Sequence, residues 1–133
     1  EPILVEPYKK TKVKKVIISS GKMFIDLKTE LQKNPNDELC LIALEQLYPF
    51  PKEEINNVLS EFRNLETVRW VQEEAKNQGA WSFVSLKLQS ILEDRKVNLE
   101  YHGRQVRSST AEGDGEIYKI LQSKVIEEAL KHN

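Results

Sequence analysis

The sequence contains one cysteine, five glycines and five prolines, and it has no long apolar stretch. The lone cysteine, Cys40, excludes an internal disulfide and is typical of a reducing compartment. A membrane-spanning helix needs about 20 consecutive apolar residues. Because such a stretch and a signal-peptide pattern are both absent from this sequence, we expect no membrane partner. The formal net charge of -1 provides no overall field for polyanions, so we also expect no nucleic-acid partner.

The chain is long enough to form one domain with a single hydrophobic core. It has 133 residues, of which 39% are hydrophobic and 31% are charged. It does not begin with methionine, and its first 15 residues combine two prolines with a lysine-rich run, which is typical of a segment cut from a longer protein. We predict a linker or edge segment from a preceding domain over residues 1–15 and one domain over residues 16–133. The lysine-rich run is interpreted as a solvated linker, with a docking or anion-binding patch as the alternative. It comprises Lys9, Lys10, Lys12, Lys14 and Lys15.

Short continuous apolar runs alternate along the chain with apolar stripes at helical spacing. A run such as residues 39–44 is expected of a strand covered on both faces, and the i, i+3, i+4, i+7 spacing over residues 55–62 predicts a helix. This alternation predicts an α/β sandwich with a mainly parallel sheet and helices on both faces. The expected strands are 16–19, 39–44, 67–72 and 97–101, and the expected helices lie near 23–31, 55–62, 80–92 and 116–131.

Several patterns associated with catalysis are present only in part. "GDG" at residues 113–115 opens the thiamine diphosphate motif, but too few residues follow it to complete the metal site, so it is interpreted as the turn before the last helix. "SSGK" at residues 19–22 lacks the glycine spacing of a phosphate loop. Cys40 lies inside an apolar run, as a buried inert thiol would, and His102 and His132 have no partner at metal-ligand spacing. We therefore predict no catalytic and no metal-binding residues.

The most distinctive stretch is "VQEEAKNQGAW", residues 71–81, where a buried strand is followed by a polar turn. Glu73 and Glu74 are adjacent and would point to opposite sides of a strand, which is a poor arrangement for an acid/base pair. Gly79 permits close approach, and Trp81 supplies a large apolar surface. We expect a contact with another domain or subunit, with an internal loop-and-cap role as the alternative. The expected interface residues are Glu73, Glu74, Lys76, Asn77, Gln78 and Trp81.

With these residues in view, the chain resembles the C-terminal domain of thiamine-dependent 2-oxoglutarate dehydrogenases. The stretches "SGKMFIDL", "ALEQLYPFP", "VQEEAKNQGAW", "YHGR" and "SSTAEGD" occur in family order and at family-like spacing across residues 16–131. One departure is Ala75, where the family usually has proline. The resemblance implies a transketolase C-terminal-like fold, a three-layer α/β/α sandwich with a mixed, mostly parallel five-stranded sheet. The fifth strand would come from "ILV" or "KTKV" near the start.

The resemblance also implies a function for the parent protein. Such enzymes decarboxylate 2-oxoglutarate in the tricarboxylic acid cycle and transfer the succinyl group to lipoamide, using thiamine diphosphate and Mg²⁺ held by preceding domains. Under this reading the present segment holds no cofactor and is inactive alone. Its implied partners are the preceding domains, the second subunit of a homodimer and the dihydrolipoyl succinyltransferase component. The implied location is the bacterial cytoplasm, or the mitochondrial matrix in a eukaryote.

A second candidate site follows the expected edge strand, where arginines and hydroxyls suited to phosphate lie together. Because some relatives bind nucleotide or acyl-coenzyme A effectors near this domain, the resemblance suggests an effector site here, with intramolecular salt bridges or a solvated surface as the alternative. Two other functions stay open: a free-standing nucleotide-binding regulatory module, and the equivalent domain of another thiamine-dependent enzyme. The candidate effector residues are Arg104, Arg107, Ser108 and Ser109.

Overall fold

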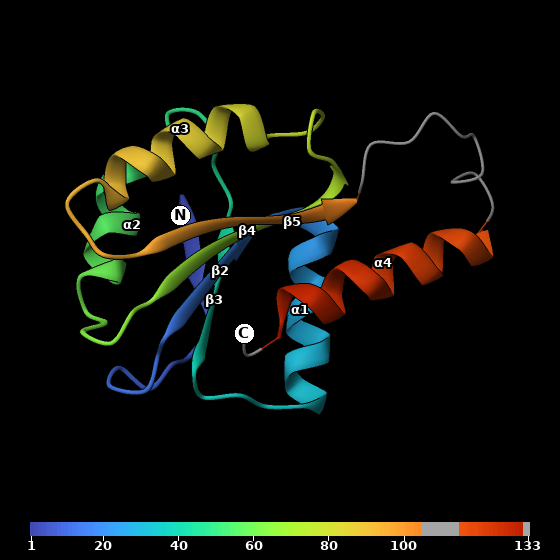
Figure 1. Cartoon of the computed structure of the whole chain (residues 1–133), viewed down its shortest axis with the longest axis horizontal. Coiled ribbons are helices and arrows are strands. Elements are labelled where there is room, and N and C mark those ends of the chain that lie inside the picture. The colour runs from blue at the N-terminus through green and yellow to red at the C-terminus, as the bar shows by residue number, and fades with distance from the viewer. Residues whose placement is uncertain (105–114, 132–133) are drawn as a thin grey trace.

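The computed structural model of the chain describes residues 1–104 and 115–131. Within them, a central sheet lies between two layers of helices (Figure 1). The elements in chain order are β1 (Ile3–Val5), β2 (Lys15–Ser19), α1 (Gly21–Lys33), β3 (Leu39–Leu44), α2 (Lys52–Leu59), β4 (Thr67–Ala75), α3 (Trp81–Leu92), β5 (Asn98–Arg104) and α4 (Gly115–Ala129).

The sheet has five strands in the order β1-β3-β2-β4-β5. The strands β2, β3, β4 and β5 are parallel to one another, and β1 alone runs antiparallel, pairing Ile3 with Leu44 and Val5 with Ile42. The predicted mixed, mostly parallel five-stranded sheet is therefore confirmed. Of the two candidates for the fifth strand, "ILV" forms it.

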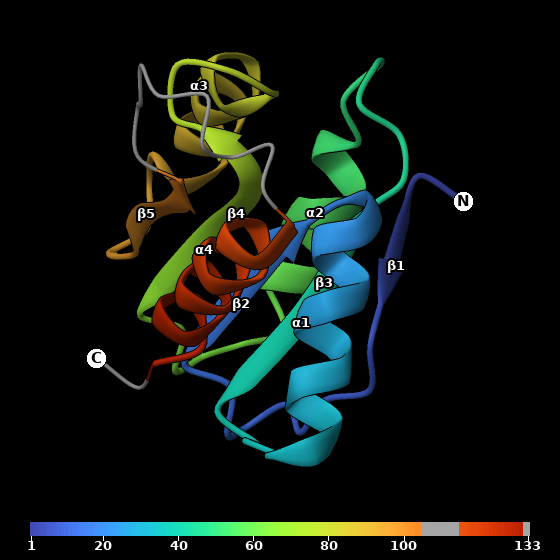
Figure 2. The ribbon, with the colours of Figure 1, turned by 90° about the vertical axis from the view of Figure 1, so that its right-hand side faces the viewer.

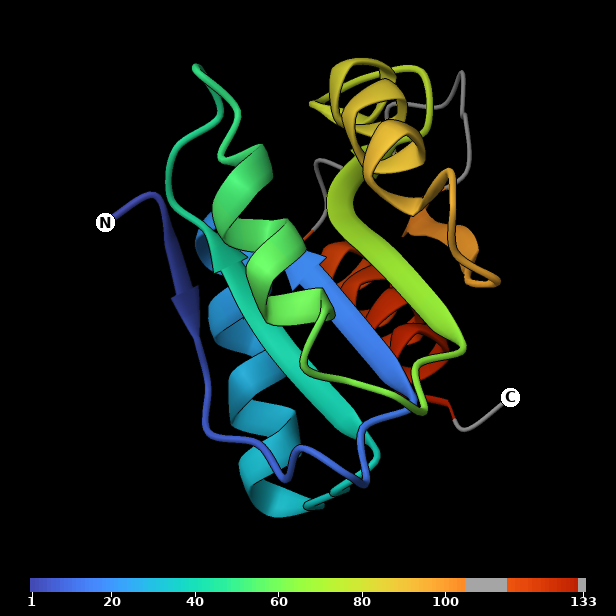
Figure 3. The ribbon, with the colours of Figure 1, turned by 90° about the vertical axis from the view of Figure 1, so that its left-hand side faces the viewer.

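Both faces of the sheet are covered, which explains why every residue of β2 and β3 is buried. The helices α2 and α3 pack on one face, where Trp70 of β4 is the largest buried side chain (Figure 3). The helices α1 and α4 pack on the other face, over Ile17 and Val71 (Figure 2). All six residues of β3 are buried, as the run "LCLIAL" predicts for a strand between two helix layers.

The boundaries of three elements differ most from the sequence expectation. The strand β4 continues through Glu73 and Glu74 to Ala75, which pairs with Arg104. Val71 pairs with His102. Between these two pairs β4 contains more residues than β5, so β4 forms a bulge between Val71 and Ala75. The strand β5 accordingly runs to Arg104 instead of ending near residue 101, and α2 begins at Lys52 and ends at Leu59.

A fully buried arginine joins the sheet to the end of α4. Arg69 of β4 donates from Nε to Glu100 Oε1 at 2.8 Å and from Nη1 to the carbonyl oxygens of Ala129 and Lys131 at 2.8 and 2.7 Å. The cation therefore satisfies carbonyls at the negative end of the helix. Burial raises the pKa of Glu100, but the hydrogen bonds from His102 and Arg69 outweigh it and leave that pKa below its usual value.

The basic run near the start lies against the sheet. Lys9 and Lys12 both form ion pairs with Asp37, at 3.0 and 3.9 Å, and Lys14 pairs with Glu38 at 3.7 Å. These exposed pairs contribute little each. The assignment of residues 1–15 to a preceding domain stays a prediction, while β1 within that segment forms part of the sheet.

Candidate functional site

The expected interface residues lie at the edge of the sheet where the parallel strands end, here called the carboxyl edge. Ser19, Leu44, Ala75 and Arg104 are the last residues of β2, β3, β4 and β5. In α/β sheets this edge presents loops and helix N-termini rather than paired backbone, and it is the usual position of binding surfaces. The turn over residues 76–80, which joins β4 to α3, lies at this edge.

Gln72 organises that turn from within. Its side chain is buried, and Oε1 accepts hydrogen bonds from the indole N–H of Trp70 at 2.8 Å and from the backbone N–H of Trp81 at 3.2 Å. Its Nε2 donates to the carbonyl oxygens of Ala75 at 2.9 Å and Gln78 at 2.7 Å. One amide therefore satisfies backbone groups on both sides of the turn and the first turn of α3.

Gly79 closes the turn against the strand. Its φ is +66°, in the left-handed region that favours glycine, and a Cβ at this position would lie 2.8 Å from Glu74 Oε1 and 3.2 Å from Gln72 Nε2. The turn is thereby held by backbone geometry and by Gln72. The side chains of Glu74, Lys76, Asn77 and Gln78 are all exposed around it.

Trp81 is half-buried beside the turn and packs against Tyr101 of β5, with ring centroids 5.3 Å apart. The Tyr101 hydroxyl donates to the carbonyl of Glu74 at 2.9 Å, and the ammonium of Lys76 lies 5.7 Å from the centre of the Tyr101 ring. Burial raises the pKa of Tyr101, so its hydroxyl stays a donor at neutral pH. Trp81 therefore has packing partners inside the chain and still presents part of its surface at the carboxyl edge.

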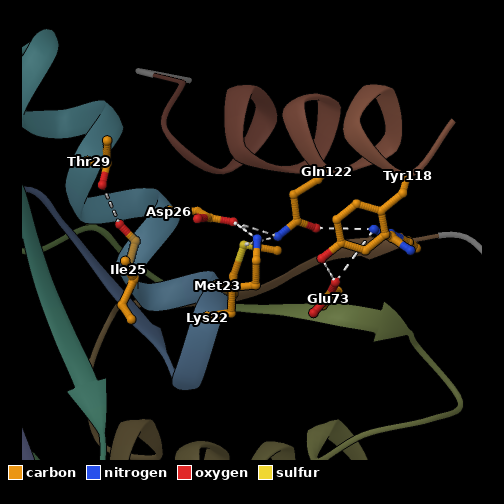
Figure 4. A network of polar contacts seen from close by, with 9 residues as sticks. Lys22, Met23, Ile25, Asp26, Thr29, Glu73, Tyr118 and Gln122 are labelled. Carbon is orange, nitrogen blue, oxygen red and sulfur yellow. Dashed lines mark hydrogen bonds and ion pairs between the residues drawn. The ribbon is translucent and has the colours of Figure 1, made fainter. Parts of the chain in front are cut away.

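Glu73 points to the other side of the sheet from this cluster, towards α4. The hydroxyl of Tyr118 donates a short hydrogen bond to Glu73 Oε1, and Arg104 Nη2 lies 3.7 Å from the same oxygen (Figure 4). The Arg104 guanidinium lies 4.6 Å from the centre of the Tyr118 ring. The hydrogen bond to Glu73 raises the pKa of Tyr118. Glu73 thus ties β4 to α4 and β5.

The same network continues to α1 through Gln122. Its Oε1 accepts from Arg104 Nη2 at 3.3 Å, and its Nε2 donates to Asp26 Oδ2 at 3.0 Å (Figure 4). Asp26 also accepts from Lys22 at 2.9 Å, and this hydrogen bond raises the pKa of Lys22. The network holds α1, α4, β4 and β5 together at the carboxyl edge.

The structure therefore separates the six expected interface residues into two groups. Glu73 is bound within the network beneath α4, whereas Glu74, Lys76, Asn77, Gln78 and Trp81 surround the turn on the α3 side. The sequence expectation that the two glutamates point to opposite sides fits this placement. The interface role itself stays a prediction.

Of the four candidate effector residues, only Arg104 lies within the described residues. It is 9% exposed and contacts Glu73, Gln122 and Tyr118. These contacts match the alternative of intramolecular salt bridges at this position, and the effector site stays a prediction. Arg107, Ser108 and Ser109 lie outside the described residues, as do His132 and most of the "GDG" turn.

Burial raises the pKa of the Cys40 thiol to about 12, so the thiolate needed for nucleophilic reactivity does not form near neutral pH. Across residues 1–104 and 115–131, no group of three or more histidine, cysteine, aspartate or glutamate side chains is placed to hold a metal ion. Within the same ranges, no helix has the length and apolar character required to cross a membrane.

Sequence reasoning missed the residues that organise the site from inside. Gln72, Arg69 and Gln122 are buried polar side chains with partners on other elements. For Gln72 a signal was present, because a glutamine that ends a buried strand just before a turn is well placed to satisfy the backbone of that turn. Arg69 stands inside an apolar run, where a buried charge requires a partner, but its partners lie 31 to 62 residues away in the chain.

Comparison with known proteins adds to this geometry. The family model described as 2-oxoglutarate dehydrogenase C-terminal matches residues 1–130. The chain belongs to the 2-oxoglutarate dehydrogenase C-terminal family. It is 56% identical over all 133 residues to the 2-oxoglutarate dehydrogenase E1 components of Staphylococcus aureus strains bovine RF122 / ET3-1, JH9 and Newman. The chain spans 14% of the length of these relatives.

Membership of the 2-oxoglutarate dehydrogenase C-terminal family confirms the resemblance drawn from the motifs "EQLYPFP" and "KNQGAW". Both motifs lie at the carboxyl edge, in the loop between β3 and α2 and in the turn between β4 and α3. The stretches that identify the family therefore gather on one side of the domain.

Proposed function

We propose that this chain is the C-terminal, non-catalytic domain of a 2-oxoglutarate dehydrogenase E1 component, and that its carboxyl edge contacts the rest of that enzyme. The observation that carries the proposal is the family match over residues 1–130, combined with the exposed side chains of the polar turn at the carboxyl edge. The longer protein would carry out oxidative decarboxylation of 2-oxoglutarate, with succinyl transfer to lipoamide, in the tricarboxylic acid cycle.

In this proposal the cofactors are bound elsewhere in the longer protein. Thiamine diphosphate supplies the carbanion chemistry of decarboxylation when bound, and Mg²⁺ holds its diphosphate. Such a metal site requires converging oxygen ligands. The described residues of this chain contain no metal-holding group of acidic or histidine side chains, so they do not fit the role of cofactor ligands. In this proposal the role of the chain is structural.

The polar turn is suited to an interface because the backbone hydrogen bonds that hold it do not use its exposed side chains. Gln72 accepts from and donates to the groups around the turn, and the N–H of Gln78 donates to the carbonyl of Ala75 at 2.9 Å. Glu74 and Asn77 therefore have hydrogen-bonding capacity to offer a neighbour. The proposed neighbours are the preceding domains and the second subunit of a homodimer, within a complex that includes the dihydrolipoyl succinyltransferase component. The single buried Cys40 suits a reducing compartment such as the bacterial cytoplasm.

The double substitution Glu74→Ala and Asn77→Ala tests the proposed interface. It should weaken dimer assembly of the full-length protein by at least about tenfold, because a buried hydrogen bond to a charged group is worth about 1.5 to 3 kcal/mol. Sedimentation across a dilution series measures the assembly. Urea unfolding of the 133-residue chain should change by less than about 0.5 kcal/mol.

The matched control is Glu93→Ala with Asn98→Ala, which removes the same two residue types from exposed positions at the opposite end of the sheet. This control should leave assembly unchanged. If the Glu74 and Asn77 variant assembles normally and the isolated chain is instead clearly destabilised, the turn is an internal cap and the interface proposal is wrong.

A further inference from the structure

A second group of side chains at the carboxyl edge is apolar and exposed. The loop that follows β3 presents Leu47 at 41% and Tyr48 at 82% exposure, and Phe50 and Phe83 are half-buried beside them. We call these four residues the aromatic platform. Single exposed apolar residues are ordinary on a protein surface, but a contiguous group marks an interaction site.

The aromatic platform is assembled before any partner binds. Phe83, in the first turn of α3, lies 6.3 Å from the Tyr48 ring centre and 6.2 Å from that of Phe50. Gln46 Nε2 donates to the carbonyl of Pro49 at 2.8 Å and braces the loop. The ammonium of Lys87 lies 5.4 Å from the Phe83 ring centre and places a positive charge at the rim. Binding on this surface would therefore cost little ordering of the loop.

We propose that the aromatic platform is a docking surface for the part of the 2-oxoglutarate dehydrogenase chain that precedes this domain. The proposal rests on the proposed function, because it requires that the chain belongs to a longer enzyme. The aromatic platform is a surface separate from the polar turn. That partner surface would be apolar, with an acceptor for the Tyr48 hydroxyl and a carboxylate opposite Lys87.

The position of the first residues of the chain supports this choice of partner. Because β1 is antiparallel to β3, its first residues lie at the carboxyl edge, where the carbonyl of Pro2 accepts the N–H groups of Glu45 and Gln46 at 2.9 and 3.1 Å. Leu47 is the next residue along the loop. The matched relatives are about seven times longer than this chain. The family model that matches the chain is described as 2-oxoglutarate dehydrogenase C-terminal. Their preceding residues would thus join the domain beside the loop after β3 that carries Leu47 and Tyr48 (Figure 3).

The aromatic platform also adjoins the proposed interface. Trp81 and Phe83 both belong to the first turn of α3, with Trp81 packed towards Tyr101 and Phe83 towards Tyr48. The first turn of α3 therefore lies between the polar turn and the aromatic platform. Together they form the arrangement of an apolar centre with a polar rim that is common in interfaces.

Cysteine labelling tests the docking surface directly. Leu47→Cys reports on the aromatic platform while keeping its three aromatic rings, Lys76→Cys reports on the polar turn, and Lys96→Cys is an exposed control at the opposite edge. The native Cys40 is buried with a pKa near 12 and contributes little background. Maleimide labelling at each position is followed by peptide mass spectrometry in the 133-residue chain and in the full-length protein.

The expected result is that labelling at position 47 slows by at least about tenfold in the full-length protein, while labelling at position 96 changes by less than about twofold. Unslowed labelling at position 47 with slowed labelling at position 76 would overturn the docking surface and leave the proposed function standing. Unslowed labelling at both positions would overturn both. If labelling at position 47 slows as the concentration of the isolated chain rises, a second copy occupies the platform and the proposal is wrong.

Discussion

Replacement of Arg69 by methionine is expected to lower the free energy of unfolding of the chain by about 3 to 5 kcal/mol. The guanidinium is fully buried, and its loss would leave Glu100 and the carbonyls of Ala129 and Lys131 without the cation that binds them. Methionine retains much of the side-chain volume, so the loss reports mainly on the polar contacts. Urea unfolding of the wild type and the variant gives the difference.

Arg63→Met is the matched control for Arg69→Met, because Arg63 is exposed, and it should change stability by less than about 0.5 kcal/mol. The pH dependence offers a second test. The lowered pKa of Glu100 contributes stability that is present above its unfolded pKa and is lost as the pH falls through its folded pKa. That acid-dependent loss should shrink in Arg69→Met. Equal stabilities of Arg69→Met and wild type would show that α4 does not depend on this arginine.

Replacement of Gln72 by leucine is expected to cost about 2 to 4 kcal/mol, because each buried polar group left without a partner costs about 1 to 3 kcal/mol. The affected groups are the indole N–H of Trp70, which is 1% exposed, and the backbone N–H of Trp81. The carbonyls of Ala75 and Gln78 also lose their donor. Thermal or urea unfolding measures the cost, and tryptophan fluorescence should shift as Trp70 loses its acceptor.

Gln78→Leu is the control within the same turn, since the structure uses the backbone carbonyl of Gln78 and leaves its side chain exposed. It should be close to neutral in the isolated chain. If the two leucine variants are equally stable, Gln72 does not organise the turn. Glu74 and Asn77 could then be needed to hold the turn and would not be available to a neighbour.

The layers of the fold were predictable because apolar pattern and burial coincide. The run of residues 39–44 is buried throughout, and the i, i+3, i+4 stripe of α2 places Ile55 and Leu59 in the core. The end of β4 was not predictable in the same way. Glu73 and Glu74 are polar, yet they belong to the strand, which continues to the pairing of Ala75 with Arg104, a residue distant in the sequence.

The candidate site was predictable in its position and less so in its internal partners. "VQEEAKNQGAW" indicated the polar turn, and the family match confirms the resemblance drawn in part from this stretch. Strand alternation predicts that Glu73 and Glu74 point to opposite sides. No local pattern encodes the bulge in β4 between Val71 and Ala75 or the contacts of Glu73 with Tyr118 and Arg104. The aromatic platform likewise brings together Tyr48 and Phe83, which lie on different elements and meet only in the folded chain.

Under the proposed function, this chain would supply structure to a larger enzyme and perform no chemistry alone. The most direct measurement is 2-oxoglutarate decarboxylation by the purified 133-residue chain with thiamine diphosphate and Mg²⁺, alongside a calorimetric titration of the cofactor. The account predicts turnover equal to the buffer blank and no saturable cofactor binding, while the full-length protein turns over under the same conditions. Turnover above the blank, or saturable binding of thiamine diphosphate by the isolated chain, would contradict it.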